Sequence, residues 1–256
     1  MLHTSNFSIH AVACFLLLCS VCATILGGIA GQASLTASQA DVAADAGVGL
    51  DAGAEHGGGI TVVIDAGHGG EDGGTQSAKG MQEKTVNLEI AQMLNTMLGA
   101  GGTQTVMTRD EDILLYDRNV DYKGRKKVLD LAARRKIAEE TEGAVFVSIH
   151  MNAFPETQYQ GLQVFFSPND PRSQMLADGI QSSTHTYLQP DNNRKIKEAT
   201  SSIYLLDRLK CPAVLIECGF LSNPEEAARF ETEEYRQKIA FILFCSLMDY
   251  ISEQSA

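Results

Sequence analysis

The sequence predicts a single three-layer α/β domain, in which a mainly parallel, twisted sheet is flanked by helices on both faces. From residue 60 onward, short apolar runs alternate with longer amphipathic runs. Strands that alternate with helices favour a parallel sheet whose two faces are both covered. Polar residues also stand at the ends of several apolar runs, and in such folds functional groups gather at the carboxyl ends of the strands.

The predicted strands are short apolar runs of strand length. They cover residues 60–65, 103–108, 144–149, 162–166 and 213–217. Between the first two strands, Val86, Ile90 and Leu94 recur at four-residue steps, which places them on one face of a helix. Further helices are predicted over residues 128–138, 172–188 and 233–251.

The first thirty residues differ in composition from the rest of the chain. Residues 1–30 contain no Lys, Arg, Asp or Glu, and residues 11–26 are continuously apolar or small. This pattern predicts a signal peptide or an N-terminal membrane anchor through residues 11–30. No Lys or Arg precedes the apolar run, and small residues near Ala23 and Ala30 both fit a signal peptidase. Cleavage and anchoring therefore stay open, and a buried helix of the fold is a third alternative.

Residues 31–59 form a second distinct segment. They are dominated by Ala, Gly, Ser and Asp and contain no Lys or Arg. Such a segment cannot bury enough apolar surface to order itself, so we predict a flexible linker. The folded part of the chain is therefore expected over residues 60–256.

Charge and cysteine content argue against a nucleic-acid partner and against a structural disulfide. The chain of 256 residues carries a formal net charge of −12, which argues against nucleic acid as a partner because a polyphosphate needs a cationic surface. Three of the six cysteines lie in the apolar leader. No structural disulfide is expected among the others, because Cys211 and Cys218 flank one extended strand that is longer than a disulfide can bridge. Cys245 lies among apolar residues and is expected in the core.

Three residues suited to chemistry stand at the ends of predicted strands. His68 follows the first strand, His150 follows the third, and Glu217 closes the last. Two imidazoles and a carboxylate suit Zn²⁺, and a set of three ligands leaves a fourth position for water, as in catalytic zinc sites. Two of these residues also have a structural alternative: His68 could cap a glycine-rich turn, and Glu217 could form a buried ion pair.

Five segments carry a resemblance to a known family. They read ITVVIDAGHGGEDGG (60–74), MQEKTVNLEIAQML (81–94), TVMTRDED (105–112), FVSIHMNA (146–153) and PAVLIECGFLSNPEEA (212–227). In this order they resemble the N-acetylmuramoyl-L-alanine amidases of the zinc-dependent amidase 3 family. The resemblance covers essentially the whole predicted domain, and the combination of GHGG, SIHxNA and GFLSN is highly specific.

The resemblance implies a site, a reaction and a place of action. The family's ligands for one zinc ion fall here on His68, Glu83 and His150, and its catalytic carboxylate falls on Glu217. The implied reaction is hydrolysis of the amide between N-acetylmuramic acid and L-alanine, with the glycan and stem peptide of peptidoglycan as partners. Such an enzyme acts outside the cytoplasm, either secreted, periplasmic or anchored facing the cell wall. For Glu83, stabilisation by a helix dipole is the structural alternative.

Two further residues are candidates for substrate binding. Arg134 resembles an Arg that recurs in this helix of the family, with an ordinary ion pair as the alternative. Asn152 follows His150 by two positions, and it could bond the substrate or hold a turn.

The finer placement rests on residues 192–217, which resemble the short amidases of endospore formers that help to mature the spore cortex. The sequence shows no repeat that resembles a wall-binding module, so an activator protein or the membrane is expected to target the enzyme.

Two other classes of function stay open. A zinc peptidase acting on the stem peptide would use the same chemistry, and a non-catalytic wall-binding module would be expected to lack one of the four site residues.

Overall fold

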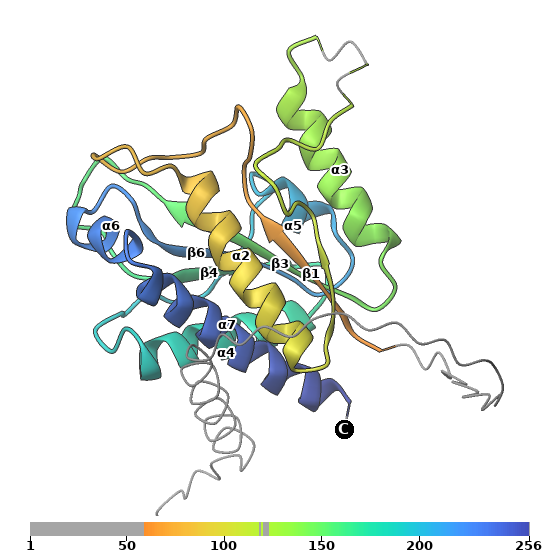
Figure 1. Cartoon of the computed structure of the whole chain (residues 1–256). Helices are drawn as coiled ribbons and strands as arrows, with labels where there is room; N and C mark the ends of the chain where they lie inside the picture. Colours follow the sequence, from red (N-terminus) through yellow and green to blue (C-terminus); the bar gives the residue numbers. More distant parts are fainter. Residues whose placement is uncertain (1–58, 118, 120–122, 256) are drawn as a thin grey trace, which may run out of the picture. The chain divides into compact units, whose positions relative to one another are not determined.

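The computed structural model describes residues 59–117, 119 and 123–255 (Figure 1). The predictions for the leader and for nearly all of the linker therefore lie outside the described residues. Within the described part of the chain, no helix is long and apolar enough to cross a membrane.

Six strands form one sheet in the order β2-β1-β3-β6-β4-β5. Their bounds are Thr61–Ala66 (β1), Gln104–Met107 (β2), Ala144–Asn152 (β3), Gln163–Phe166 (β4), Lys197–Glu198 (β5) and Ala213–Phe220 (β6). The four strands from β2 to β6 in this order are mutually parallel. Strand β4 pairs antiparallel with β6, and β5 runs parallel to β4. The predicted mainly parallel sheet is thus confirmed.

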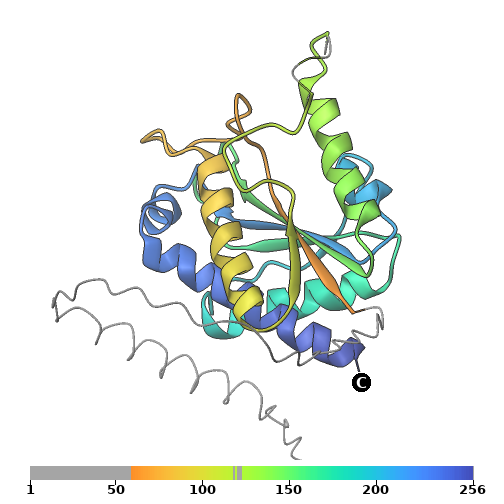
Figure 2. The same ribbon diagram turned by 45° about the vertical axis from the view of Figure 1, so that its right-hand side comes forward.

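Helices cover both faces of the sheet (Figure 2). Their bounds are Glu83–Ala100 (α2), Lys126–Glu140 (α3), Arg172–Tyr187 (α4), Tyr204–Arg208 (α5), Pro224–Phe230 (α6) and Glu233–Gln254 (α7). Helices α2, α4 and α7 pack on one face and α3 and α5 on the other, as the two separate hydrophobic clusters show. The three-layer α/β architecture is therefore confirmed.

Strand β1 shows why the sheet is buried on both sides. All of its residues are buried, so the strand reads as a continuous apolar run rather than an alternating one. Val62 and Ile64 face the cluster of α2, α4 and α7, whereas Val63 faces the cluster of α3 and α5. This is the period-two alternation of a strand between two layers of helices.

The strand register brings the candidate residues to one edge of the sheet. Ala66 of β1 is the Cα partner of Ile149 in β3, and the N–H of Gly67 donates to the carbonyl oxygen of Ile149 at 3.0 Å. On the other side of β3, His150 is the partner of Glu217 in β6. The carboxyl ends of three parallel strands therefore converge, as the sequence predicts.

Cys211 and Cys218 are free thiols. Cys218 is buried in the cluster beneath α2, α4 and α7, on the face opposite to its neighbour Glu217 by strand alternation. Cys245 packs against the same cluster, where the sequence places it.

Candidate metal centre

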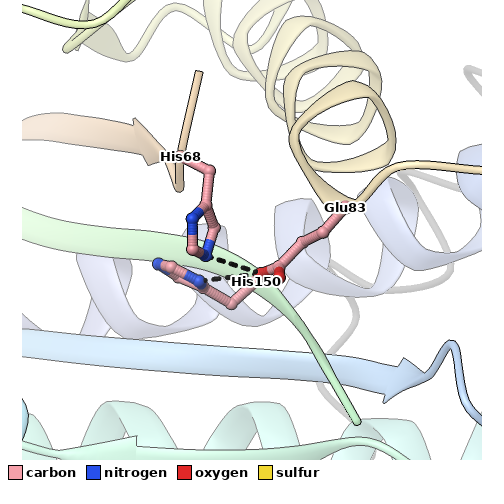
Figure 3. A group of neighbouring side chains, drawn as sticks. All are labelled: His68, Glu83 and His150. Atoms are coloured by element: carbon pink, nitrogen blue, oxygen red, sulfur yellow. Dashed lines mark hydrogen bonds and ion pairs between the residues drawn. The ribbon is translucent and has the colours of Figure 1, made fainter. Parts of the chain in front are cut away.

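Three side chains meet at the carboxyl edge of the sheet: His68 from the loop after β1, Glu83 from the first position of α2, and His150 from β3 (Figure 3). One potential ligand atom from each lies within 4.8 Å of the others. Among the described residues, this is the group of His, Cys, Asp and Glu side chains that could hold a metal ion.

Glu83 lies between the two imidazoles. Its Oε1 is 3.2 Å from Nε2 of His68 and 3.0 Å from Nδ1 of His150. The two rings are arranged edge to face, with centroids 5.1 Å apart. Two imidazole nitrogens and one carboxylate oxygen make up the donor set of catalytic zinc sites, in which a fourth position is left to water. The residues present thus fit a catalytic metal ion.

The carboxylate of Glu83 is held in its charged form. It is 3% exposed, and burial by itself would raise its pKa, but the hydrogen bonds and charges of His150 and His68 outweigh burial and hold the pKa well below its usual range. Backbone N–H groups add to this effect: Thr75 donates to Oε2 at 2.8 Å and Met151 donates to Oε1 at 3.0 Å. A deprotonated carboxylate is the form that ligates a metal.

The backbone of His68 is in the left-handed region, at φ 62°, which is uncommon for a residue with a side chain. Arg134 supports this conformation, because its Nη2 donates to the carbonyl oxygen of His68 at 2.7 Å. On the ring, Nδ1 lies 3.0 Å from Oδ2 of Asp72. A carboxylate on the far nitrogen of a ligating imidazole fixes the orientation of the ring.

Glycines leave the room that these side chains need. A Cβ added to Gly67 would lie 2.3 Å from the imidazole of His150, and one added to Gly74 would lie 2.4 Å from Oε2 of Glu83. Gly74 also has a φ of 66°, which disfavours a side chain in any case. The glycine-rich sequence after β1 is therefore a requirement of the site's packing.

Glu217 lies beside this group, at the register position of His150 on the neighbouring strand. Residues that are paired in register point to the same face of a sheet, with the strands about 4.8 Å apart. Oε2 of Glu217 is buried without a hydrogen-bond partner among the described residues. Burial, with a smaller contribution from Glu83, raises the pKa of Glu217 to about 7 despite the nearby His150. An unsatisfied buried carboxylate with a raised pKa is typical of functional sites.

Arg134 is buried behind the site, with a side chain that is 1% exposed. Its guanidinium pairs with Asp65 at 2.7 Å and with Asp130 at 2.8 Å. It also donates to the carbonyl oxygens of Ala66 and His68, both at 2.7 Å. These contacts support the ion-pair alternative for Arg134, in which it positions the loop after β1.

Asn152 ends β3, where the pairing with β6 shifts register after His150. Its carbonyl oxygen accepts from the N–H of Leu221 at 2.9 Å. Its side chain is partly exposed at the same edge of the sheet as the metal centre. Substrate binding by Asn152 stays a prediction.

Arg109 supports the site and was missed by sequence reasoning. Its Nε donates to the carbonyl oxygen of Ala66 at 2.8 Å, and its Nη2 donates to those of Gly67 and Lys84 at 3.0 and 2.9 Å. It therefore joins the loop after β1 to the first turn of α2. The available signal was a charged residue placed directly after a predicted strand, within TVMTRDED.

Residues 62–243 match the family described as N-acetylmuramoyl-L-alanine amidase. The chain belongs to this family. Its members are enzymes that hydrolyse an amide bond in peptidoglycan, and this amidase therefore acts outside the cytoplasm, where that polymer lies. The resemblance found in the sequence is confirmed. Neither the peptidase nor the non-catalytic wall-binding module finds support in this match.

Individual relatives extend the comparison. The germination-specific N-acetylmuramoyl-L-alanine amidase of Bacillus subtilis is 34% identical over 196 residues, which cover 77% of this amidase and 81% of the relative. The amidase LytC of the same species is 29% identical over 75% of this amidase and 36% of its own length. Among solved structures, the CwlD amidase of Clostridioides difficile, in complex with the GerS lipoprotein, has a TM-score of 0.71 and 35% identity. That match covers 75% of this amidase and 98% of CwlD.

Proposed function

We propose that this amidase is zinc-dependent and cleaves the bond between N-acetylmuramic acid and L-alanine, with His68, Glu83 and His150 as the ligands of one zinc ion. The observation that carries the proposal is the convergence of two imidazoles and one charged carboxylate within 4.8 Å. A neighbouring carboxylate, Glu217, has no hydrogen-bond partner on Oε2 within the described structure. Three potential ligands beside an unpartnered carboxylate are the groups that a hydrolytic metal site requires, whereas a structural metal site needs ligands alone.

When bound, zinc supplies a Lewis acid that activates water and polarises the carbonyl of the scissile amide. Oε2 of Glu217 accepts the proton of the attacking water and returns it to the departing nitrogen of L-alanine. Burial raises the pKa of Glu217 above its ordinary value, and a carboxyl group whose pKa lies closer to the working pH is better able to accept a proton and then return it. Glu83 stays charged, because His150 and His68 hold its pKa low and the N–H groups of Thr75 and Met151 also donate to its carboxylate.

Two isosteric substitutions separate catalysis from metal binding. In Glu217→Gln, hydrolysis of peptidoglycan should fall by roughly 10²- to 10⁴-fold, the usual contribution of a general acid–base group, while the zinc content stays at that of the wild type. In Glu83→Gln, zinc content and hydrolysis should fall together, because a ligand is lost. Elemental analysis of purified protein gives the zinc content, and end-group analysis gives hydrolysis. Near-normal hydrolysis by a folded Glu217→Gln protein would overturn the assignment of Glu217.

The finer proposal is a role in maturing the spore cortex, with an activator protein. It is supported by the identity of 34% to a germination-specific relative and by the likeness to an amidase whose structure was solved with a lipoprotein. The chain can be expressed during sporulation in a Bacillus subtilis strain that lacks its germination-specific amidase. The short amidases of endospore formers that residues 192–217 resemble help to make muramic-δ-lactam in the cortex. Restored muramic-δ-lactam would therefore support the role. Its continued absence, with the protein present and folded, would contradict it.

Export is the remaining part of the proposal, through a signal peptide or anchor in residues 1–30 and a linker in residues 31–59. Mass spectrometry of the protein recovered from an expressing bacterium distinguishes the forms. Loss of the leader means secretion, and an intact chain in the membrane fraction means anchoring. An intact chain that stays in the cytoplasm would contradict export.

A further inference from the structure

Exposed aromatic side chains lie on the loop of residues 153–161, which follows β3 and so begins close to His150. Phe154 is 48% exposed and Tyr159 is 41% exposed. In the described part of the chain, the other exposed large hydrophobic side chains are Val128 on α3 and, at opposite ends of α4, Met175 and Tyr187. A pair of exposed aromatic rings beside an active site indicates a binding surface rather than a packing defect.

The two rings continue towards the site in one row. The centroids of Phe154 and Tyr159 are 5.0 Å apart, and those of Tyr159 and Phe220 are 6.3 Å apart. Phe220 ends β6 three positions after Glu217, and the guanidinium of Arg194 lies 4.5 Å from its ring centroid. We name Phe154, Tyr159 and Phe220 the aromatic row. It leads from solvent towards the strand that carries the proposed general base.

The aromatic row is held in place by the turn after β6. The N–H of Phe154 donates to Oγ of Ser222 at 2.9 Å, and Nδ2 of Asn223 donates to the carbonyl oxygen of Tyr159 at 3.3 Å. Ser222 and Asn223 belong to the GFLSN motif, which contributes no ligand to the metal centre. The motif therefore fixes the loop, and a fixed loop binds with a smaller entropy cost than a free one.

A cleft of about 560 Å³ lies next to the row, with Tyr159 in its lining. Its volume falls within the range of small-molecule sites. Its lining is mostly polar and offers both donors and acceptors, among them Gln158, Asp191, Asn193, Arg194, Glu225 and Arg229. Because both signs of charge are present, the cleft does not select a strongly charged ligand. Flat aromatic rings beside mixed donors and acceptors suit a sugar, which has apolar C–H faces and a rim of hydroxyl groups.

We propose that the exposed rings of Phe154 and Tyr159 and this cleft form a saccharide subsite for a pyranose ring of the glycan strand, next to the muramic acid whose amide is cut. Phe220 is 3% exposed, so its role is to support the ring of Tyr159. The inference rests on the proposed function, because that reaction brings a polymeric glycan to the edge of the sheet where the row ends. The subsite binds a sugar that does not itself react, so the affinity for the substrate rises with the length of the glycan.

Kinetics on two substrates test the subsite. One is a single N-acetylmuramic acid that carries a stem peptide, and the other is a tetrasaccharide with the same peptide on one muramic acid. In the double variant Phe154→Leu/Tyr159→Leu, the ratio of kcat/KM for the long over the short substrate should fall about three- to tenfold, as expected from the loss of aromatic stacking. The conservative variant Phe154→Tyr should keep the ratio of the wild type.

Met175→Ala is the matched control, since Met175 is 51% exposed on α4. The first turn of α4 lies at the other edge of the sheet, because Ser173 accepts a hydrogen bond from the N–H of Ala213, at the start of β6. The ratio should therefore not change in this variant. Leucine keeps apolar bulk at both exposed positions, so the double variant should fold, and circular dichroism checks this.

The outcomes separate the two proposals. If the folded wild type, loaded with zinc, hydrolyses neither substrate, whether alone or with an extract of sporulating cells that supplies the proposed activator protein, the proposed function fails. If the wild type hydrolyses both and the double variant keeps its ratio, the saccharide subsite is wrong. An equal loss of kcat/KM on both substrates leaves this ratio unchanged and would point instead to a peptide subsite, because both substrates carry the same stem peptide. As a second measurement, the tetrasaccharide without peptide should bind Glu217→Gln protein more weakly when both rings are replaced.

Discussion

Arg134 and Arg135 are neighbours in α3 with opposite surroundings. The side chain of Arg134 is 1% exposed and pairs with Asp65 and Asp130, whereas that of Arg135 is 36% exposed and pairs with Glu139. Arg134→Gln should lower the free energy of unfolding by roughly 3–5 kcal/mol, because breaking a buried pair leaves an uncompensated carboxylate. It should also weaken zinc binding, because the carbonyl oxygen of His68 loses its donor.

Arg135→Gln provides the control. Its exposed ion pair is screened by solvent, so its urea midpoint and zinc affinity should stay close to those of the wild type. Urea unfolding followed by circular dichroism and a zinc titration measure both properties. Equal effects of the two substitutions would contradict the role given to Arg134.

Individual site residues differ in how far the sequence predicts them. His68, His150 and Glu217 stand at strand ends, so topology alone brings them together. Glu83 has no such position and is found only through the family resemblance. The roles of Arg109 and Arg134 could not be predicted from periodicity, because they depend on hydrogen bonds to backbone carbonyls far away in the chain. Only the folded chain brings these carbonyl groups next to the two arginines.

At the scale of elements, the turn after β1 should tolerate no side chain at Gly67. In Gly67→Ala the new Cβ would lie 2.3 Å from the ring of His150, so the ring must move. We expect a loss of about 1–3 kcal/mol in stability from overpacking, together with weaker zinc binding. Thermal unfolding with and without zinc measures both effects.

Gly99→Ala is the matched substitution, because nothing lies within 4 Å of a Cβ added at Gly99, in the last turn of α2. Alanine is the better helix former, so this variant should be stabilised by up to about 1 kcal/mol. Its zinc binding should equal that of the wild type. Unimpaired zinc binding in Gly67→Ala would show that the turn has room to adjust.

The longer helices follow from apolar periodicity, but short elements do not. Helices α5 and α6 and strand β5 were not predicted, because five, seven and two residues are too few to show a period. For α6 another signal existed. Asn223 caps the helix by accepting from the N–H groups of Glu225 and Glu226, and Pro224 follows at its first position. An Asn-Pro pair of this kind marks a helix start even when periodicity is absent.

At the scale of the whole molecule, the class of the fold was predictable and the order of its strands was not. A strand that is buried on both faces has the same apolar pattern whichever way its neighbour runs. The sequence of β4 therefore did not reveal that it pairs antiparallel with β6. That pairing places Gln163 opposite Glu217, so an unpredicted feature of the topology shapes one side of the site.

Acid stability also belongs to the whole molecule, through the buried Asp65. Burial alone would raise its pKa, but Arg134 and Ser148 outweigh burial and lower the pKa below the ordinary value of 3.8. A carboxyl group with a lowered folded-state pKa stabilises the fold above its unfolded pKa, and this stability is lost as pH falls through the folded value. The free energy of unfolding should therefore decline below about pH 4.

Asp65→Asn isolates this contribution. The variant should be less stable than the wild type at neutral pH, and its stability should decline less steeply in acid. Urea unfolding across an acidic pH series gives the slope of the free energy of unfolding against pH for each of the two proteins. Parallel slopes for the two proteins would mean that other carboxylates determine the acid transition.

End-group analysis of digested peptidoglycan tests the central claim most directly. Peptidoglycan is incubated with the full-length protein and zinc, and the newly formed amino termini are identified. We predict free N-terminal L-alanine on released stem peptides, which is abolished by a chelator and restored by added zinc. New termini inside the stem peptide, or release of L-alanine termini that a chelator does not affect, would contradict the account.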